Sequence, residues 1–309
     1  MTALVPSARR PAWLDPQLYP YLPRRFATAE GDLSYLDEGS GPVVLLVHGT
    51  PSWSFEFRGV IADLSRDHRV IALDHLGFGL SDKPEGAALT PRDHARRLRA
   101  LVEALDLRDV TLVVHDFGGP IGLPLAVDYA PGRRRVCALV VLNSWMWPSD
   151  GDRTIARIDR MVRSPLGRLL YRRLGFSARV ILPAAFGDKR RLTRAVHRHY
   201  LGPLGSVRER EGTYALACAL RGADPDYAEL WRRRGALHGL PMTIVWGDKD
   251  PALTAAHRDR WTAEFPEARL HRVEDAGHFV AEERPEAVAA EVRALTAARR
   301  AEAGTAAAR

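Results

Sequence analysis

The segment Val110-Thr-Leu-Val-Val-His-Asp-Phe-Gly-Gly119 carries the strongest fold signal in the chain. Its first five residues are apolar or β-branched, which predicts a strand buried on both faces of a parallel sheet. Gly118 and Gly119 follow shortly after and allow the backbone to turn sharply into a helix. We therefore expect Asp116 to project from a tight corner between strand and helix, at the carboxyl edge of the sheet.

The predicted position of Asp116 is that of a nucleophile elbow. Aspartate stands where serine is usual, and Val114 replaces the first glycine of that motif. A carboxylate oxygen displaces a leaving group from an sp³ carbon and forms an alkyl ester on the enzyme, so halides and strained ring oxygens are suitable leaving groups. The alternative is that Asp116 only caps the following helix, because aspartate is a common N-cap residue.

Composition fits a globular protein with one large α/β domain or two smaller units. The chain has 309 residues, of which 46% are hydrophobic and 27% charged. The net charge is +7, but basic triplets are scattered without interleaved aromatic residues, so we expect no nucleic-acid partner. Two cysteines, Cys137 and Cys218, make no disulfide framework and favour a reducing, cytoplasmic compartment. No apolar run approaches about 18 residues, so we expect neither export nor a membrane partner.

Strand and helix patterns alternate along most of the chain, as in a parallel α/β sheet flanked by helices. A hairpin is expected over residues 25–36, at a sheet edge. Strands are predicted at 43–47, 70–73, 110–114, 136–142, 242–246 and 269–273. Thr90 is expected to cap a helix that has Pro91 in its first turn and Asp93 at the third position.

The alternation stops after the strand that ends near Asn143. From residue 148 to about residue 236, helical patterns follow one another without a strand. The sequence therefore predicts an α/β core made of residues 1–147 and 237–309, with an inserted helical cap over residues 148–236. We expect this cap to cover Asp116 and to shape the substrate pocket.

Two further loops follow buried strands and therefore lie on the same carboxyl edge as Asp116. The first contains Asp250 and the second contains His278. The chain order of nucleophile, acid and base is that expected of an α/β hydrolase, in which the histidine activates water and the acid fixes its tautomer.

These loops resemble those of the haloalkane dehalogenases and the neighbouring epoxide hydrolases of the α/β-hydrolase superfamily, over roughly residues 25–298. The matching motifs are His48-Gly-Thr-Pro51, Asp74-His-Leu-Gly77, Ser81-Asp-Lys-Pro84, His115-Asp-Phe-Gly-Gly119, Trp246-Gly-Asp-Lys-Asp250 and Gly277-His278. The resemblance implies that Asp116 attacks carbon, that His278 directs water at the resulting ester, and that no metal or organic cofactor is needed. Asn143 occupies the alternative acid position, so Asp250 is expected to hold that role.

The chain departs from the dehalogenase pattern at the leaving-group site. Thr50 and Phe117 stand where dehalogenases usually have asparagine and tryptophan, whose side-chain N–H groups bind the departing halide. Their backbone N–H groups are expected to form the oxyanion hole during ester hydrolysis. Trp145 and Trp147 are candidates for the substrate site and for replacing the missing donors, although core packing is the more ordinary role for each.

The resemblance favours haloalkane dehalogenase chemistry on a small apolar substrate, with water as the second reactant. Epoxide opening competes with it, because epoxide hydrolases protonate the ring oxygen with two cap tyrosines and Tyr200 and Tyr214 lie in segments suited to face the cleft. The same scaffold also supports β-lactone decarboxylation, or the role of a ligand receptor without catalysis. The sequence does not predict the oligomeric state.

Overall fold

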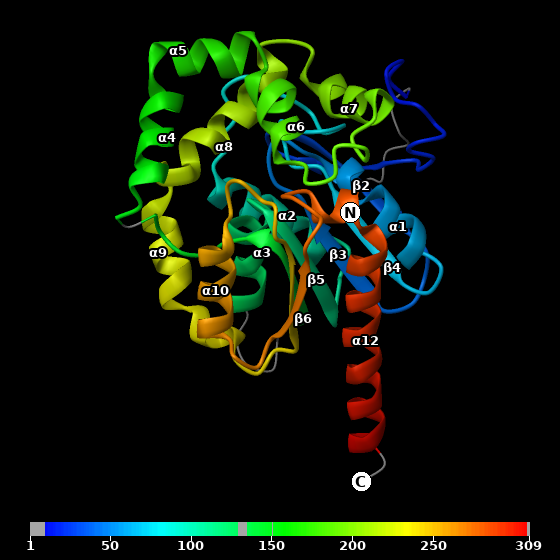
Figure 1. Cartoon of the computed structure of the whole chain (residues 1–309). Helices are drawn as coiled ribbons and strands as arrows, with labels where there is room; N and C mark the ends of the chain where they lie inside the picture. The colour runs from blue at the N-terminus through cyan, green and yellow to red at the C-terminus, as the bar shows by residue number, and fades with distance from the viewer. Residues whose placement is uncertain (1–9, 129–134, 150, 308–309) are drawn as a thin grey trace.

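The computed structural model describes residues 10–128, 135–149 and 151–307, which form one eight-stranded sheet with helices on both faces (Figure 1). The strand order is β1-β2-β4-β3-β5-β6-β7-β8, in which β2 runs antiparallel to both neighbours and all other neighbouring pairs are parallel. The strands are β1 (Arg24–Thr28), β2 (Gly31–Glu38), β3 (Val43–Val47), β4 (Arg69–Leu73), β5 (Val110–Asp116), β6 (Val136–Ser144), β7 (Met242–Gly247) and β8 (Arg269–Val273). This architecture confirms the predicted α/β fold.

Each face of the sheet packs against its own hydrophobic core, because successive side chains of a strand point to opposite faces. In β3, Leu45 and Val47 belong to one core, and Val44 and Leu46 belong to the other. The first core is covered by α2 (Pro91–Ala104), α3 (Gly118–Val127) and α10 (Ala255–Glu264). The second is covered by α1 (Arg58–Leu64) and α12 (Pro285–Ala307). All seven residues of β5 are buried, so the strand that ends at Asp116 lies within the body of the protein.

The start of α2 follows the prediction made from its sequence. Thr90 accepts a hydrogen bond from the Asp93 backbone N–H at 3.3 Å, and the Asp93 side chain bonds back to the Thr90 backbone, which completes a capping box. Pro91 occupies the first helical position, where its missing N–H leaves no hydrogen bond unmade.

The segment between β6 and β7 contains helices and connecting loops but no strand in its described part, and it lies above the carboxyl ends of the central strands (Figure 1). Its elements are α4 (Arg153–Arg163), α5 (Pro165–Arg168), η2 (Leu169–Arg173), η3 (Ser177–Ile181), α6 (Leu182–Ala185), α7 (Arg194–Leu201), η4 (Gly202–Leu204), η5 (Arg208–Arg210), α8 (Glu211–Gly222), α9 (Asp224–Arg232) and η6 (Arg234–Leu237). Across the described residues, no helix is long and apolar enough to cross a membrane.

Candidate active site

Asp116 is the last residue of β5 and has a backbone φ of 52°, in the left-handed region that side chains rarely adopt. Helix α3 begins two residues later at Gly118, so the chain reverses within a single tight corner. A Cβ at Gly118 would lie 2.0 Å from the carbonyl oxygen of Val47, so only glycine permits the helix to start this close to β3. The corner is an elbow that presents one carboxylate at the edge of the sheet.

The Asp116 carboxylate is held in place from the loop that follows β3. The backbone N–H of Thr50 donates to Oδ1 of Asp116 at 2.8 Å. Gly49 leaves the space that the carboxylate occupies, since a Cβ there would lie 2.1 Å from the same oxygen. On the other side, the Ser144 hydroxyl donates to the Asp116 backbone carbonyl at 2.6 Å. Oδ1 is therefore fixed, and Oδ2 is the oxygen directed toward the rest of the site.

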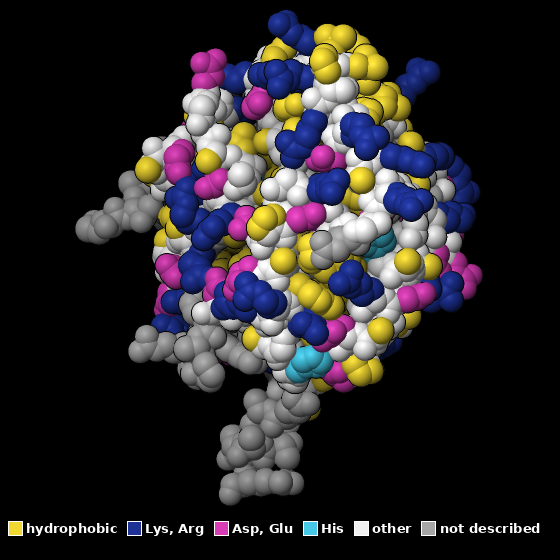
Figure 2. Space-filling model, turned by 90° about the vertical axis from the view of Figure 1, so that its left-hand side faces the viewer, with side chains coloured by type: hydrophobic (Ala, Val, Ile, Leu, Met, Phe, Trp, Pro, Cys, Tyr) yellow, Lys and Arg dark blue, Asp and Glu magenta, His cyan; other side chains and the backbone are white. Residues whose placement is uncertain are grey.

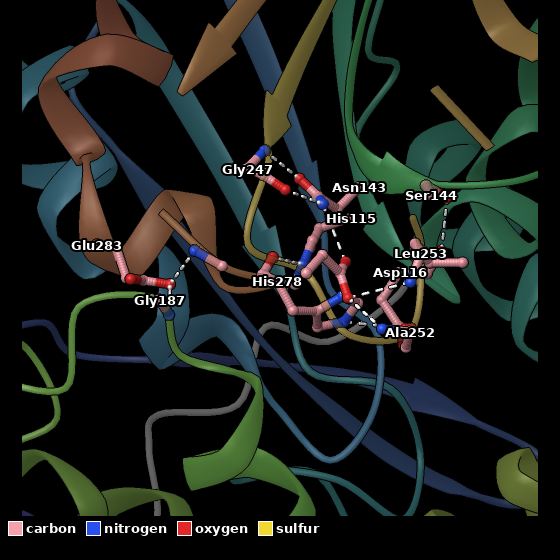
Figure 3. A network of polar contacts seen from close by, with 12 residues as sticks. His115, Asp116, Asn143, Ser144, Gly187, Gly247, Ala252, Leu253, His278 and Glu283 are labelled. Carbon is pink, nitrogen blue, oxygen red and sulfur yellow. Dashed lines mark hydrogen bonds and ion pairs between the residues drawn. The ribbon is translucent and has the colours of Figure 1, made fainter. Parts of the chain in front are cut away.

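His278 contacts both Asp116 and Asp250, and Figure 3 shows it beside Asp116. Its Nε2 is 3.4 Å from Oδ2 of Asp116, and its Nδ1 is 2.6 Å from Oδ2 of Asp250. All three side chains are almost completely buried. The structure thus brings together the three residues that the sequence nominated as nucleophile, acid and base.

The two carboxylates on either side of His278 control its protonation. Burial alone would lower the pKa of His278, but the charge of Asp250 and the hydrogen bond to Asp116 raise that pKa well above its ordinary value. Burial likewise opposes ionisation of Asp250, yet its pKa is lowered by the charge of His278 and by hydrogen bonds to its carboxylate. The resting site therefore favours a protonated imidazole between two anions.

Asn143 supports the acid, a role that the sequence did not reveal. Its Nδ2 donates to Oδ2 of Asp250 at 2.9 Å, and its Oδ1 accepts the backbone N–H of Gly247 at 2.8 Å (Figure 3). The other oxygen of Asp250 accepts the backbone N–H groups of Ala252 at 2.8 Å and Leu253 at 3.0 Å. Both oxygens of Asp250 are therefore fixed, and with them the orientation of the imidazole.

A second buried pair, also missed from the sequence, supports the backbone of His278. The Nδ1 of His115 lies 3.0 Å from Oε1 of Glu56, and its Nε2 lies 2.8 Å from the carbonyl oxygen of His278. Since a carbonyl only accepts, Nε2 of His115 carries a proton in this contact. The exposed fraction of each side chain is 1%. The position of His115 beside Asp116 was a usable signal, whereas nothing in the sequence singled out Glu56.

A cavity of about 400 Å³ opens onto Asp116 and is walled by both core and cap. Thr50, Phe117 and Trp145 line it from the core. The remaining walls come from the cap and from the loop after β7, and consist of Asp152, Thr154, Ile155, Ile158, Val162, Tyr171, Ser177, Ile181, Thr213, Ala217, Leu220, Pro251, Ala252, Leu253, Thr254 and His257. Apolar side chains provide much of this wall, which suits a small apolar substrate.

Several aromatic residues considered from the sequence lie elsewhere. Trp147 does not line this cavity and instead borders a neighbouring one of about 340 Å³, which shares Trp145. Tyr200 and Tyr214, the two tyrosines considered for epoxide opening, do not line the cavity either. The Tyr200 hydroxyl is buried and donates to Glu282 at 2.7 Å.

The leaving-group site contains one unpaired donor. The Thr50 hydroxyl is buried at the cavity wall and has no hydrogen-bond partner among the described residues. Phe117 contributes only an apolar ring, which packs edge-on against Trp145 with their centroids 4.8 Å apart. Within the described parts of the chain, no cluster of three or more His, Cys, Asp or Glu side chains is arranged to hold a metal ion.

Comparison with known proteins shows the family to which this chain belongs. Residues 42–285 match the family model described as alpha/beta hydrolase fold. The chain is a member of that family. Haloalkane dehalogenase 2 of Mycobacterium tuberculosis (strain H37Rv) is 35% identical over 280 residues, which cover 90% of this chain and 96% of the relative. The cis-3-alkyl-4-alkyloxetan-2-one decarboxylase of Shewanella oneidensis is 31% identical, covering 84% of each chain.

Solved structures agree with the fold of this α/β hydrolase. An ancestral haloalkane dehalogenase superimposes with a TM-score of 0.76 at 26% identity, covering 89% of this chain and 99% of that one. The haloalkane dehalogenase DbeA from Bradyrhizobium elkani gives a TM-score of 0.78 at 22% identity, covering 89% and 98% of the two chains.

Proposed function

We propose that this hydrolase cleaves a bond at an sp³ carbon through a covalent ester on Asp116, with His278 as general base and Asp250 as its partner. The single observation that carries the proposal is the chain of contacts from Asp116 through His278 to Asp250, at 3.4 and 2.6 Å, on the wall of a largely apolar cavity. An aspartate that served only as the N-cap of the following helix would not require this arrangement.

In the first step, Oδ2 of Asp116 attacks the substrate carbon, and the leaving group departs with the electron pair of the broken bond. Oδ1 stays on the Thr50 N–H, to which it is bonded at 2.8 Å. In the second step, His278 takes a proton from water, and the water oxygen attacks the carbonyl carbon of the Asp116 ester. The bond from that carbon to the alkyl oxygen then breaks, and the alcohol leaves with a proton from His278. The charge that develops on Oδ1 is stabilised by the same N–H, and the Phe117 N–H is the second candidate donor.

Ester formation also makes His278 ready to act as a base. Asp116 is one of the two anions that raise the pKa of His278. Its alkylation removes that charge, so the pKa of His278 falls and the imidazole releases its proton. The base becomes available once the ester exists.

The leading reaction is hydrolysis of a carbon–halogen bond in a small haloalkane, with water as the second reactant. Relatives of this chain are named haloalkane dehalogenases, and the cavity is mainly apolar. Thr50 is proposed as the side-chain donor to the departing halide, since its hydroxyl is otherwise unpaired. We place the enzyme in the cytoplasm, in keeping with its two free cysteines, and propose no nucleic-acid partner.

β-Lactone decarboxylation is the second candidate, favoured by Phe117 and by the decarboxylase relatives. Here Asp116 attacks the sp³ ring carbon that bears the ring oxygen. The bond between that carbon and the oxygen breaks, which leaves a carboxylate on the substrate. Loss of carbon dioxide then expels Asp116 and forms an alkene, so no water is consumed. Because no halide is released, the two side-chain N–H donors that usually bind a halide are not needed. Epoxide opening is less favoured, because epoxide hydrolases use two cap tyrosines. Among the described residues, Tyr171 is the only cap tyrosine that lines the cavity.

The test is mass spectrometry of a His278→Phe variant incubated with 1-bromohexane. An alkyl adduct on the peptide that contains Asp116 should accumulate, because ester formation does not need the base but hydrolysis does. Asp116→Asn is the control and should give no adduct. Full turnover by His278→Phe without an adduct would contradict the assignment. Parallel assays of bromide, and of alkene from a disubstituted β-lactone, decide between the two candidate reactions.

A further inference from the structure

The cap carries an unusual concentration of exposed apolar side chains. Six of the eight large hydrophobic residues that are exposed in the described structure fall within residues 161–181, which we call the cap patch. They are Met161 (36% exposed), Leu166 (61%), Leu169 (49%), Leu174 (55%), Val180 (50%) and Ile181 (38%). Single exposed apolar residues are normal on any surface, but a group of them on one segment marks a contact site.

The same segment is strongly basic. Exposed arginines precede the apolar residues at Arg153, Arg157 and Arg160 and are interleaved with them at Arg163, Arg168, Arg173 and Arg179. Asp159 is the only acidic residue in the sequence between 153 and 181, and it is bound to Arg163 at 2.8 Å. The excess of positive charge therefore faces solvent beside the apolar side chains.

The cap patch lies at the far end of the molecule from the base of the sheet. Helix α5, inside the patch, forms the upper edge of the molecule in Figure 1. Figure 2 shows hydrophobic side chains at this upper end surrounded by Lys and Arg side chains. A flat partner can approach this end without meeting the rest of the molecule.

We propose that the cap patch binds the surface of an anionic lipid bilayer. Leucines in a helical segment flanked by arginines match the composition of interfacial helices, which bury apolar side chains at the headgroup boundary while their cations bind lipid phosphates. A nucleic acid would satisfy the arginines but not the leucines. This inference revises the expectation of no membrane partner, which considered only export and a spanning segment.

The patch is continuous with the cavity wall. Ile181 is one of the exposed apolar residues of the patch and also lines the cavity above Asp116. Val162, next to Met161 in the sequence, lines the same cavity. A substrate dissolved in the bilayer would therefore meet the cap side of the cavity first. Membrane binding itself does not depend on the proposed reaction and is tested without turnover.

The experiment is sedimentation of the full-length protein with vesicles. One set is phosphatidylcholine alone and the other is an equal mixture of phosphatidylcholine and phosphatidylglycerol. We expect binding to the mixed vesicles only, weakened by salt because the charges are exposed. A variant carrying Arg160→Gln, Arg168→Gln and Arg173→Gln should bind about a hundred-fold more weakly, since each arginine near an anionic surface contributes about five-fold. Leu166→Ser with Leu169→Ser should also weaken binding.

The matched control replaces exposed residues outside the patch, Leu22→Ser and Arg66→Gln, and should leave binding unchanged. None of the substituted residues lines the cavity, so turnover of a short bromoalkane reports that each variant is folded. Equal binding by patch and control variants would overturn the proposal. Equal binding to vesicles with and without phosphatidylglycerol would also overturn it. Self-association without lipid that the patch variants abolish would do the same, because the patch would then bind a second copy of this chain.

Discussion

Thr50 decides how well this site stabilises a departing anion. Its hydroxyl is buried and unpaired at the cavity wall that also holds Asp116, and a hydrogen bond to a charged group contributes about 1.5–3 kcal/mol. Thr50→Val keeps the shape and the backbone N–H but removes the hydroxyl. We expect the rate of bromide release in the first turnover to fall about 10- to 100-fold.

Thr213 provides the control for this substitution. It lines the same cavity, but its hydroxyl donates to the carbonyl oxygen of Arg210 at 2.8 Å. Thr213→Val should leave the bromide burst nearly unchanged. Equal losses in the two variants would mean that the cavity responds to any lost hydroxyl and that Thr50 has no special role.

Asn143 should affect the second step more than the first, because it acts on Asp250 and, through it, on His278. Asn143 has a φ of 29°, so Asn143→Gly removes the amide without adding backbone strain. We expect ester hydrolysis to slow about ten-fold, as for the loss of one hydrogen bond to a charged group. Alkylation, followed as the bromide burst, should be largely retained. A burst that falls as much as hydrolysis would argue against this positioning role.

The raised pKa of His278 predicts when a proton leaves the enzyme. A raised pKa means that the resting imidazole keeps its proton as pH rises past the ordinary histidine value of about 6.5, and that it loses the proton when alkylation neutralises Asp116. In a weakly buffered single turnover just above that pH, an indicator dye should report proton release together with bromide. His278→Phe should release bromide without that proton. Release that instead follows alcohol formation would contradict the mechanism.

Much of the triad was predictable because parallel strands bring the loops at their carboxyl ends together. Asp116 ends β5, Asp250 follows β7 and His278 follows β8, so their order along the chain indicated a shared edge. The support of His278 by His115 and Glu56 was not predictable. It depends on two side chains that are 59 positions apart and meet only in the folded core.

At the level of single elements, the capping box of α2 gives a test of local stability. Thr90→Ala removes the side-chain acceptor for the Asp93 N–H and should lower the free energy of unfolding by about 1 kcal/mol. Thr254 stands at the same position of α10 but makes no capping hydrogen bond, so Thr254→Ala should cost clearly less. Denaturant titration of both variants measures the difference. Equal losses would show that the capping bond contributes nothing.

Strands were easier to predict than the divisions within the cap. The apolar run at 43–47 matches β3, because burial on both faces gives a continuous signal. Residues 269–273 also form the expected strand, β8, although only Val273 is buried there. Within the predicted helical region of 148–236, residues 165–173 divide into α5 and the wider turn η2. Side-chain periodicity indicates the approximate helical repeat, but it does not indicate the switch to a wider hydrogen-bonding pattern. In the structure, η2, which has this wider pattern, packs against α8.

At the scale of the whole molecule, the core supplies the reacting groups and the cap much of the cavity wall. Replacing residues 148–236 with the corresponding segment of a dehalogenase relative should therefore change the order of preference among bromoalkanes of different length. Adduct formation on Asp116 in the His278→Phe background should persist. An unchanged preference profile would show that the cap does not select the substrate.

The amide of Asn143 and the imidazole of His278 share one oxygen of Asp250, so a side chain from the end of β6 meets the acid that follows β7 at the atom that binds His278. A carboxylate at either strand end would be adjacent to the same ring. An evolving lineage can therefore relocate its catalytic acid by gaining a second carboxylate first and converting the original to an amide later. Such a route never passes through an ancestor without an acid, and it makes the position of this residue a record of descent more than a requirement of the chemistry.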